Sequence, residues 1–310
     1  MTAGRVAALD IGSNSIHLLV CEPSPDGWRE LYREAVITRL GASLARDGTI
    51  SQEAVQRGID AVSRLAGAAR ARDAELLVFA TEAVRSAGNG SQVVAELSRV
   101  AAVPVEVITG EEEARHTYLG ARTSRGLEAG QAAIVVDVGG ASTEVARGTG
   151  SVPDLALSIQ LGSGSLTEQC LSDPPSRAEC RVAYEAACDA FRPVAPLSQH
   201  GNSDVSSVLI TGGTASTLVL LTGGAALLDS QQLEEARTTV LCAPARAVAM
   251  QFGIEEGRAR VIGGGIEICA ALLLVLKVHS MTVVPEGIRL GAIVSHFGDG
   301  RVMGATQGGE

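Results

Sequence analysis

Lysine is almost absent from this chain of 310 residues: Lys277 is the only one, and every other basic residue except histidine is arginine. A P-loop requires a lysine directly after its glycine-rich turn, and no such turn precedes Lys277. P-loop phosphate binding is therefore excluded. Positive charge is also outnumbered, since the formal net charge is −10. That balance argues against a surface for nucleic acid, and a polyanionic substrate would need local arginines and a divalent cation.

Metal-cluster, redox and export motifs are missing as well. None of the six cysteines stands in a Cys-x-x-Cys pair, so we expect small buried hydrophobic roles for them. The N-terminus lacks the design of a signal peptide. The uncharged run 206–228 exceeds the roughly 20 residues of a membrane helix, but glycine pairs interrupt it. We expect strand, turn and buried helix there, no membrane partner and a cytoplasmic location.

Aromatic residues make up only 3% of the chain and apolar residues 46%, so Ala, Val, Leu and Ile must fill the cores. Strands are expected at 5–10, 16–21, 28–38, 76–80, 105–108, 132–136, 143–146, 155–160, 208–211 and 281–284. Helices are expected at 51–72, 91–100, 111–121, 177–191, 233–241, 266–278 and 289–297. We expect a loop at 197–204 and a frayed tail from 298. Alternating strands and helices predict an α/β fold.

The length and a polar seam near 123–130 predict two domains, 1–123 and 124–310, with the last helix able to pack back on the first. Both halves open on the same pattern. Each has a strand, an aspartate, a Gly- and Ser-rich loop and a second strand, and Asp137 lies 127 positions after Asp10. We interpret this as an internal duplication of architecture.

The two loops are candidate phosphate-binding hairpins. Glycine lets backbone amides approach a ligand closely, and successive amides form a concavity for anions. The candidate phosphate contacts are Ser13, Asn14, Gly139, Gly140 and Ser142. The aspartate before each loop, Asp10 or Asp137, could hold a hydrated divalent cation that bridges to a phosphate. The alternative for a single loop of this kind is an ordinary tight turn.

Three further patterns carry candidate chemistry. Acidic residues 111–113 begin a helix, where the helix dipole favours them. Consecutive helical residues diverge around the axis, so the three cannot all point the same way. One of them could point into a cleft and act as a general base on water. Glu144 could share a metal with Asp137 across the second hairpin, or be a surface strand residue. Arg85 follows a buried strand and is a candidate phosphate clamp, or a surface arginine.

Two glycine clusters are each expected to follow a strand and open a helix. Gly212 and Gly213 form the first, and 263–265 the second. A helix N-terminus of this kind can receive a phosphate or a nucleotide.

In combination and order, these motifs resemble the exopolyphosphatase and guanosine pentaphosphate phosphatase family in its short form. The motifs are Asp10–Ser15, Thr81–Arg85, Gly110–Ala114, Asp137–Glu144, Leu161–Ser163, Gly212–Thr214 and Gly287–Gly291. The resemblance implies two ribonuclease-H-like domains of the actin-like ATPase superfamily around an interdomain cleft. It implies hydrolysis of terminal phosphates from inorganic polyphosphate with Mg²⁺ or Mn²⁺.

The resemblance also implies site roles. It makes Glu113 the general base, Asp137 and Glu144 the metal ligands, and Ser13, Asn14, Arg85, Gly139, Gly140 and Ser142 the phosphate contacts. It leaves guanosine pentaphosphate (pppGpp) or another nucleotide open as the substrate, and a homodimer open as the assembly. A phosphoanion sensor without catalysis is a third hypothesis.

The chain departs from the family pattern in its second half. Ala141 stands where relatives carry a third glycine, and Ser165 where many carry an arginine. Arg260 replaces a common aspartate, and Val284 begins a segment that usually contains a serine. These departures make the binding of a long anionic chain less secure than the hydrolytic core.

Overall fold

The computed structural model describes residues 4–25, 27–198 and 207–297. These residues form two compact units. The first runs to Thr123 and resumes at Ile288, and the second is Ser124–Gly287. The predicted tail from 298 and most of the predicted loop at 197–204 lie outside the described residues. Each unit is considered by itself.

The first unit contains a five-stranded mixed sheet in the order β3-β2-β1-β4-β5. Its strands are β1 (Arg5–Ile11), β2 (Ser15–Ser24), β3 (Gly27–Ile37), β4 (Ala74–Ala80) and β5 (Val105–Val107). Its helices are η1 (Leu40–Ser43), α1 (Leu44–Asp47), α2 (Gln52–Arg70), α3 (Glu82–Ser86), α4 (Gly90–Ala101), α5 (Gly110–Arg125) and α12 (Ile288–Phe297). Strand β2 is antiparallel to β1, and β4 is parallel to it.

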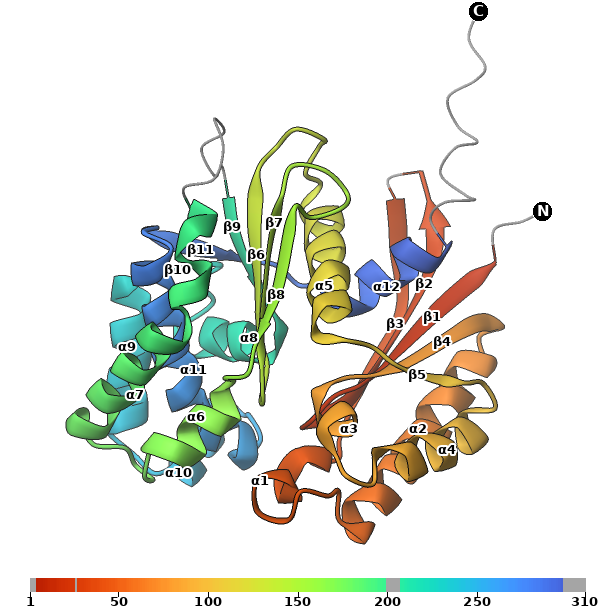
Figure 1. Cartoon of the computed structure of the whole chain (residues 1–310), viewed down its shortest axis with the longest axis horizontal. Helices are drawn as coiled ribbons and strands as arrows, with labels where there is room; N and C mark the ends of the chain where they lie inside the picture. Colours follow the sequence, from red (N-terminus) through yellow and green to blue (C-terminus); the bar gives the residue numbers. More distant parts are fainter. Residues whose placement is uncertain (1–3, 26, 199–206, 298–310) are drawn as a thin grey trace, which may run out of the picture. The chain divides into compact units, whose positions relative to one another are not determined.

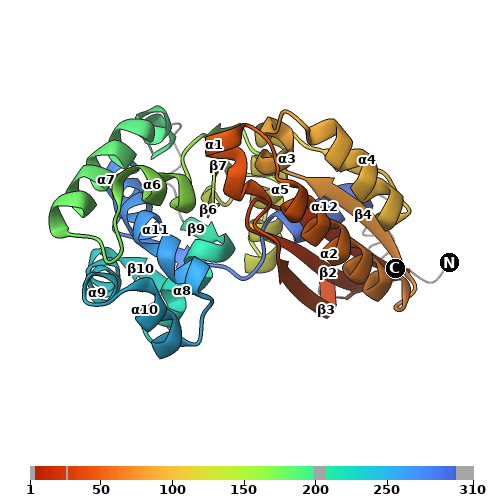
Figure 2. The ribbon, with the colours of Figure 1, turned by 90° about the horizontal axis from the view of Figure 1, so that it is seen from below.

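Alternation along β1 places apolar side chains on both faces of this sheet. Ala7 and Leu9 belong to the core that α2 and α4 cover, and these two helices lie side by side (Figure 2). Val6 and Ala8 belong to a separate core with residues of α12. The last helix therefore packs on the first unit, against β1 and β2.

The second unit contains a six-stranded sheet in the order β10-β11-β9-β6-β7-β8. Its strands are β6 (Ala133–Val138), β7 (Thr143–Gly148), β8 (Leu155–Ile159), β9 (Ser207–Thr211), β10 (Leu227–Asp229) and β11 (Ser280–Val283). Its helices are α6 (Ser163–Cys170), α7 (Arg177–Ala190), η2 (Arg192–Ser198), α8 (Gly212–Leu221), α9 (Ser230–Leu241), α10 (Ala245–Phe252) and α11 (Glu256–Val275) (Figure 1). The antiparallel hairpin β6–β7 and the parallel strand β9 repeat the arrangement of β2, β1 and β4.

The prediction that residues 263–265 open a helix after a strand is wrong. They lie in the middle of α11, which begins at Glu256. A Cβ on Gly264 would lie 2.4 Å from the backbone oxygen of Ser163 in α6, and one on Gly265 would lie 2.5 Å from Cγ2 of Thr214 in α8. Glycine is therefore needed there because neighbouring helices approach α11 closely.

The uncharged run 206–228 forms β9, α8 and β10 over the residues described. No helix in the described part of the chain combines the length and the apolar character that crossing a membrane would require.

Candidate active site

The first hairpin loop is held rigidly by backbone hydrogen bonds. The Gly12 amide donates to the Ser15 carbonyl at 3.2 Å and closes the turn. The Asn14 carbonyl accepts hydrogen bonds from the amides of Thr38 and Arg39, and the Ser13 carbonyl from that of Gly41. Ser13 and Asn14, both predicted phosphate contacts, are half-buried in this fixed loop.

The second hairpin closes in the same way at equivalent positions. The Gly139 amide donates to the Ser142 carbonyl at 3.0 Å. The carbonyl oxygen of Gly139 accepts from the amide of Ser163, and that of Gly140 from the amides of Gly164 and Ser165. A Cβ on Gly140 would meet nothing within 4 Å, so its backbone stays open to approach. Ser142, predicted to contact phosphate, is 4% exposed.

The strand register pairs the predicted metal ligands. Asp137 and Glu144 lie directly opposite each other in the β6–β7 ladder, so their side chains share one face of the sheet. Glu144 is 3% exposed, so it is not a surface strand residue, and its Oε1 accepts a hydrogen bond from Ser158 at 2.8 Å. In the first hairpin, Asp10 lies opposite His17 instead.

Asp137 and Glu144 fit a divalent cation by their chemistry. Two carboxylates on one face are a donor set that Mg²⁺ accepts when water and substrate oxygens complete the shell. Within the described residues, no group of three or more His, Cys, Asp or Glu side chains could hold a metal by itself. The pair therefore suits a cation shared with a phosphate better than one enclosed by protein. Asp10, the third predicted ligand, belongs to the first unit.

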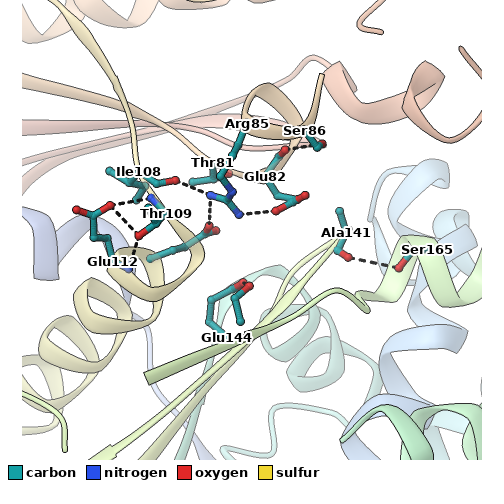
Figure 3. A network of polar contacts seen from close by, with 12 residues as sticks. Thr81, Glu82, Arg85, Ser86, Ile108, Thr109, Glu112, Ala141, Glu144 and Ser165 are labelled. Carbon is teal, nitrogen blue, oxygen red and sulfur yellow. Dashed lines mark hydrogen bonds and ion pairs between the residues drawn. The ribbon is translucent and has the colours of Figure 1, made fainter. Parts of the chain in front are cut away.

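The three glutamates at the start of α5 have three different environments. Glu111 forms an exposed ion pair with Arg115 at 2.7 Å. Glu112 caps the helix: its Oε2 accepts from the backbone amide and the hydroxyl of Thr109, and these bonds lower the pKa of Glu112 (Figure 3). Glu113 has a side chain only 12% exposed and lies 3.4 Å from Arg85. The predicted general base is thus the one whose carboxylate is not used for capping or a surface pair.

Arg85, predicted to clamp phosphate, lies in α3, the short helix after β4, between two carboxylates. Its Nη1 donates to the carbonyl oxygen of Ile108 at 2.5 Å and reaches Glu113, and its Nη2 donates to Glu82 (Figure 3). Its side chain is 23% exposed. The guanidinium is therefore oriented by α3 and by the strand that leads into α5. It is not a free surface arginine.

The N-terminus of α8 shows why its glycines are required and reveals a residue that sequence reasoning missed. A Cβ on Gly212 would lie 2.1 Å from Oδ1 of Asp137, and one on Gly213 would lie 2.2 Å from Nη1 of Arg258. Arg258 lies in α11 and is half-buried, and burial lowers its pKa against the opposing influence of Glu255. A guanidinium beside the positive end of a helix is a typical environment for an anion.

The departures in the second half are accommodated locally. Ala141 has no positive φ, so its Cβ causes no backbone strain, and its carbonyl lies 3.5 Å from Oγ of Ser165 (Figure 3). The Ser165 hydroxyl also accepts from the amide of Gly162 and caps α6. Arg260 donates to the carbonyl of Leu171 at 2.9 Å. The amide of Val284 donates to the Ile210 carbonyl and extends the sheet.

The model of the Ppx/GppA phosphatase family matches residues 20–299. The chain belongs to the Ppx/GppA phosphatase family. It is 29% identical to exopolyphosphatase 1 of Mycobacterium tuberculosis (strain H37Rv), over 94% of this chain and 87% of that protein. The same identity and coverage hold for exopolyphosphatase 1 of Mycobacterium bovis. Membership in this family confirms the prediction that the chain is an enzyme, a phosphatase.

Solved structures agree with this assignment. The Aquifex aeolicus Ppx/GppA enzyme superimposes with a TM-score of 0.78 at 28% identity, over 94% of this chain and 99% of that chain. An exopolyphosphatase from Cytophaga hutchinsonii superimposes with a TM-score of 0.85 at 20% identity, over 94% of this chain and 97% of that chain, which supports the fold alone. The predicted fold is confirmed: two ribonuclease-H-like domains of the actin-like ATPase superfamily.

Proposed function

We propose that this phosphatase hydrolyses the terminal phosphate of inorganic polyphosphate and releases orthophosphate. The observation that carries the proposal is the placement of Glu113, whose carboxylate faces Arg85 and not solvent or a helix cap. Relatives that align over most of the chain are named exopolyphosphatases, which supports polyphosphate as the substrate class.

In the proposed reaction, Glu113 accepts a proton from a water molecule whose oxygen forms a new bond to the terminal phosphorus. The bridging phosphorus–oxygen bond breaks, and the shortened chain leaves with the bridging oxygen. Arg85 exchanges its bonds to Glu82 and Glu113 for phosphate oxygens, which it can bind in a bidentate manner. Backbone amides of the Asp10–Ser15 loop, which lies in the same unit as Glu113, hold phosphoryl oxygens as negative charge develops.

We further propose that Asp137 and Glu144 hold Mg²⁺ or Mn²⁺. The cation would neutralise phosphate charge in addition to Arg85, in a chain whose formal net charge is −10. Ser158 orients Glu144 through its hydroxyl, and Gly212 leaves room for the Asp137 carboxylate. Asp10 as an additional ligand, a homodimer and a cytoplasmic location stay predictions from the sequence.

Phosphate release from polyphosphate, measured with Mg²⁺ and with Mn²⁺, tests the activity. Glu113→Gln should lower kcat by about 10²- to 10⁴-fold, the typical contribution of a positioned acid or base. Glu111→Gln is the matched control, because that exposed carboxylate pairs only with Arg115 among the contacts described. Full activity of Glu113→Gln would refute the assignment of the base. Tight polyphosphate binding without turnover by the native chain would favour the sensor hypothesis.

The choice between polyphosphate and pppGpp is a separate question, since the family includes both activities in its name. Initial rates with each substrate alone, and with both in competition, decide it. We expect the higher kcat/KM for polyphosphate. A higher value for pppGpp would leave the roles of Glu113 and Arg85 intact and change only the substrate.

A further inference from the structure

Three helices of the second unit line a groove that contains none of the predicted active-site residues. The groove has a volume of about 830 Å³ and lies among α7, α9 and α11. The lining residues recur at helical spacing on each: 177, 180, 181 and 184 on α7, 230, 233, 234 and 237 on α9, and 267, 270, 273 and 274 on α11. Cavities of this size accept ligands the size of a drug or cofactor.

The rim of the groove is cationic. Arg177 and Arg181 lie four residues apart on α7 and therefore share a face, and Lys277 and His279 follow the C-terminus of α11. All four side chains are exposed. Within the described residues, no ion pair involves Arg177, Arg181 or Lys277. In a chain with an excess of acidic residues, such a local group of cations favours an anionic ligand.

The two acidic residues of the groove cancel only part of this charge, because Arg237 pairs with both of them and leaves one net negative charge against the cations of the rim. Arg237 donates through Nε and Nη2 to the two carboxylate oxygens of Glu267, at 2.9 and 2.8 Å, and through Nη1 to Glu234. Glu267 is 1% exposed, so this pair forms part of the floor. Arg177, Arg181 and Lys277 stay available to a ligand.

The remainder of the lining is mainly apolar, and Tyr184 and Ser230 add hydroxyl groups. Leu274, which is 59% exposed, and the half-buried Val278 offer hydrocarbon surface, whereas Leu233 and Leu273 are buried beneath it. Cys180 adds a thiol whose pKa burial raises to about 11, so it is neutral. A ligand that covers this floor would gain apolar burial as well as charge pairing.

We propose that the groove binds a phosphorylated organic anion of nucleotide size. Its phosphate groups lie among Arg177, Arg181 and Lys277, and its ring or chain lies on Leu274 and Val278. The cavity is far larger than one phosphate, and the apolar floor gives the organic part a surface to cover. The site is a second one, independent of the proposed hydrolysis, because every lining residue lies within 177–279 and none belongs to the two hairpin loops or α5.

Titration calorimetry with ATP tests the proposal on the full chain carrying Glu113→Gln, which prevents turnover at the proposed active site. Arg177→Ala/Arg181→Ala should weaken one binding component by about tenfold or more, because charged hydrogen bonds are lost. Arg192→Ala is the matched control: that exposed arginine pairs with Asp189 outside the groove. Its isotherm should equal that of the parent.

Lys277→Gly separates binding from folding. Lys277 adopts a φ of 54°, a conformation that glycine accepts more readily than lysine, so this variant removes a charge while easing the backbone. It should bind ATP more weakly without loss of thermal stability. An isotherm unchanged in both groove variants would overturn the proposal. Tripolyphosphate bound at the groove as tightly as ATP would overturn the role of the apolar floor.

Discussion

Gly212→Ala should disable the predicted metal site from outside its ligands. Gly212 begins α8 with a φ of +89°, and a Cβ there would lie 2.1 Å from Oδ1 of Asp137. Ordinary van der Waals contact begins at 3.4 Å, so the carboxylate would have to move by about 1.3 Å. Metal–ligand distances tolerate only about 0.2 Å of error. The substitution should therefore move the Asp137 carboxylate out of the geometry that a metal ligand needs, although the aspartate itself is not replaced.

Two effects of this substitution have to be separated. An alanine at positive φ costs about 1–2 kcal/mol in the free energy of unfolding, whatever surrounds it. Gly223 provides the matched control, because its φ is +70° and a Cβ there would meet nothing within 4 Å. Gly223→Ala should show the backbone cost alone. Gly212→Ala should show that cost together with a loss at the metal site.

The assay is phosphate release from polyphosphate as a function of Mg²⁺ concentration, with urea unfolding measured on the same preparations. Gly223→Ala should be less stable but keep the Mg²⁺ dependence of the parent. Gly212→Ala should need about 10- to 100-fold more Mg²⁺, the range typical when support of a metal ligand is lost. Identical Mg²⁺ curves for the two variants would refute the reasoning that Asp137 binds the cation.

Three further predictions concern other parts of the chain. Gly264→Ala should lower the free energy of unfolding by about 1–3 kcal/mol, because the new methyl group would overpack against α6. Gly67→Ala, in open space on α2, should raise it by about 0.5–1 kcal/mol. Changes in the same direction for both variants would contradict the packing argument. Burial lowers the pKa of His116 below its usual 6.5 against the influence of nearby acids, so the unfolded state binds the proton more readily. The contribution of His116 to the free energy of unfolding should therefore be fully present above about pH 6.5 and decrease as the pH falls below that value. His116→Gln should reduce this pH dependence, measured by unfolding at a series of pH values. Arg258→Gln should raise the KM for polyphosphate about tenfold, as expected for one lost charged hydrogen bond, whereas the exposed Arg246→Ala should leave it unchanged in steady-state assays.

Local sequence patterns were sufficient to predict most strands and long helices. Helix α2 follows its apolar spacing from the Ser51 cap, whose hydroxyl accepts from the amide of Ala54. The hairpin positions followed from glycine and serine between apolar runs. Residues 263–265 misled for a physical reason: glycine has no side chain, so a run of three interrupts the apolar periodicity even inside a helix. The close approach of α6 and α8 explains Gly264 and Gly265.

Site residues could be predicted where neighbouring residues in the sequence identify them, but not where contacts between distant segments do. The sequence indicates that one of residues 111–113 differs from its neighbours, but the capping bonds of Glu112 and the surface pair of Glu111 decide which. Arg258 carries no local pattern that separates it from the many other arginines. Its significance comes from Gly213, which is distant in sequence and lies against its guanidinium.

The two hairpins share backbone geometry but differ at one decisive position. His17 and Glu144 occupy the same place in their ladders, opposite Asp10 and Asp137 respectively. Two ionised carboxylates opposite each other on neighbouring strands repel, and a cation bound between them would relieve that repulsion, whereas a carboxylate opposite an imidazole meets no like charge. The imidazole Nε2 instead lies 2.7 Å from the hydroxyl of Ser15 in its own hairpin. The duplicated architecture thus supplies two candidate loops for phosphate, and the facing pair of carboxylates proposed to hold a cation occurs in the second hairpin, whereas Asp10 faces His17.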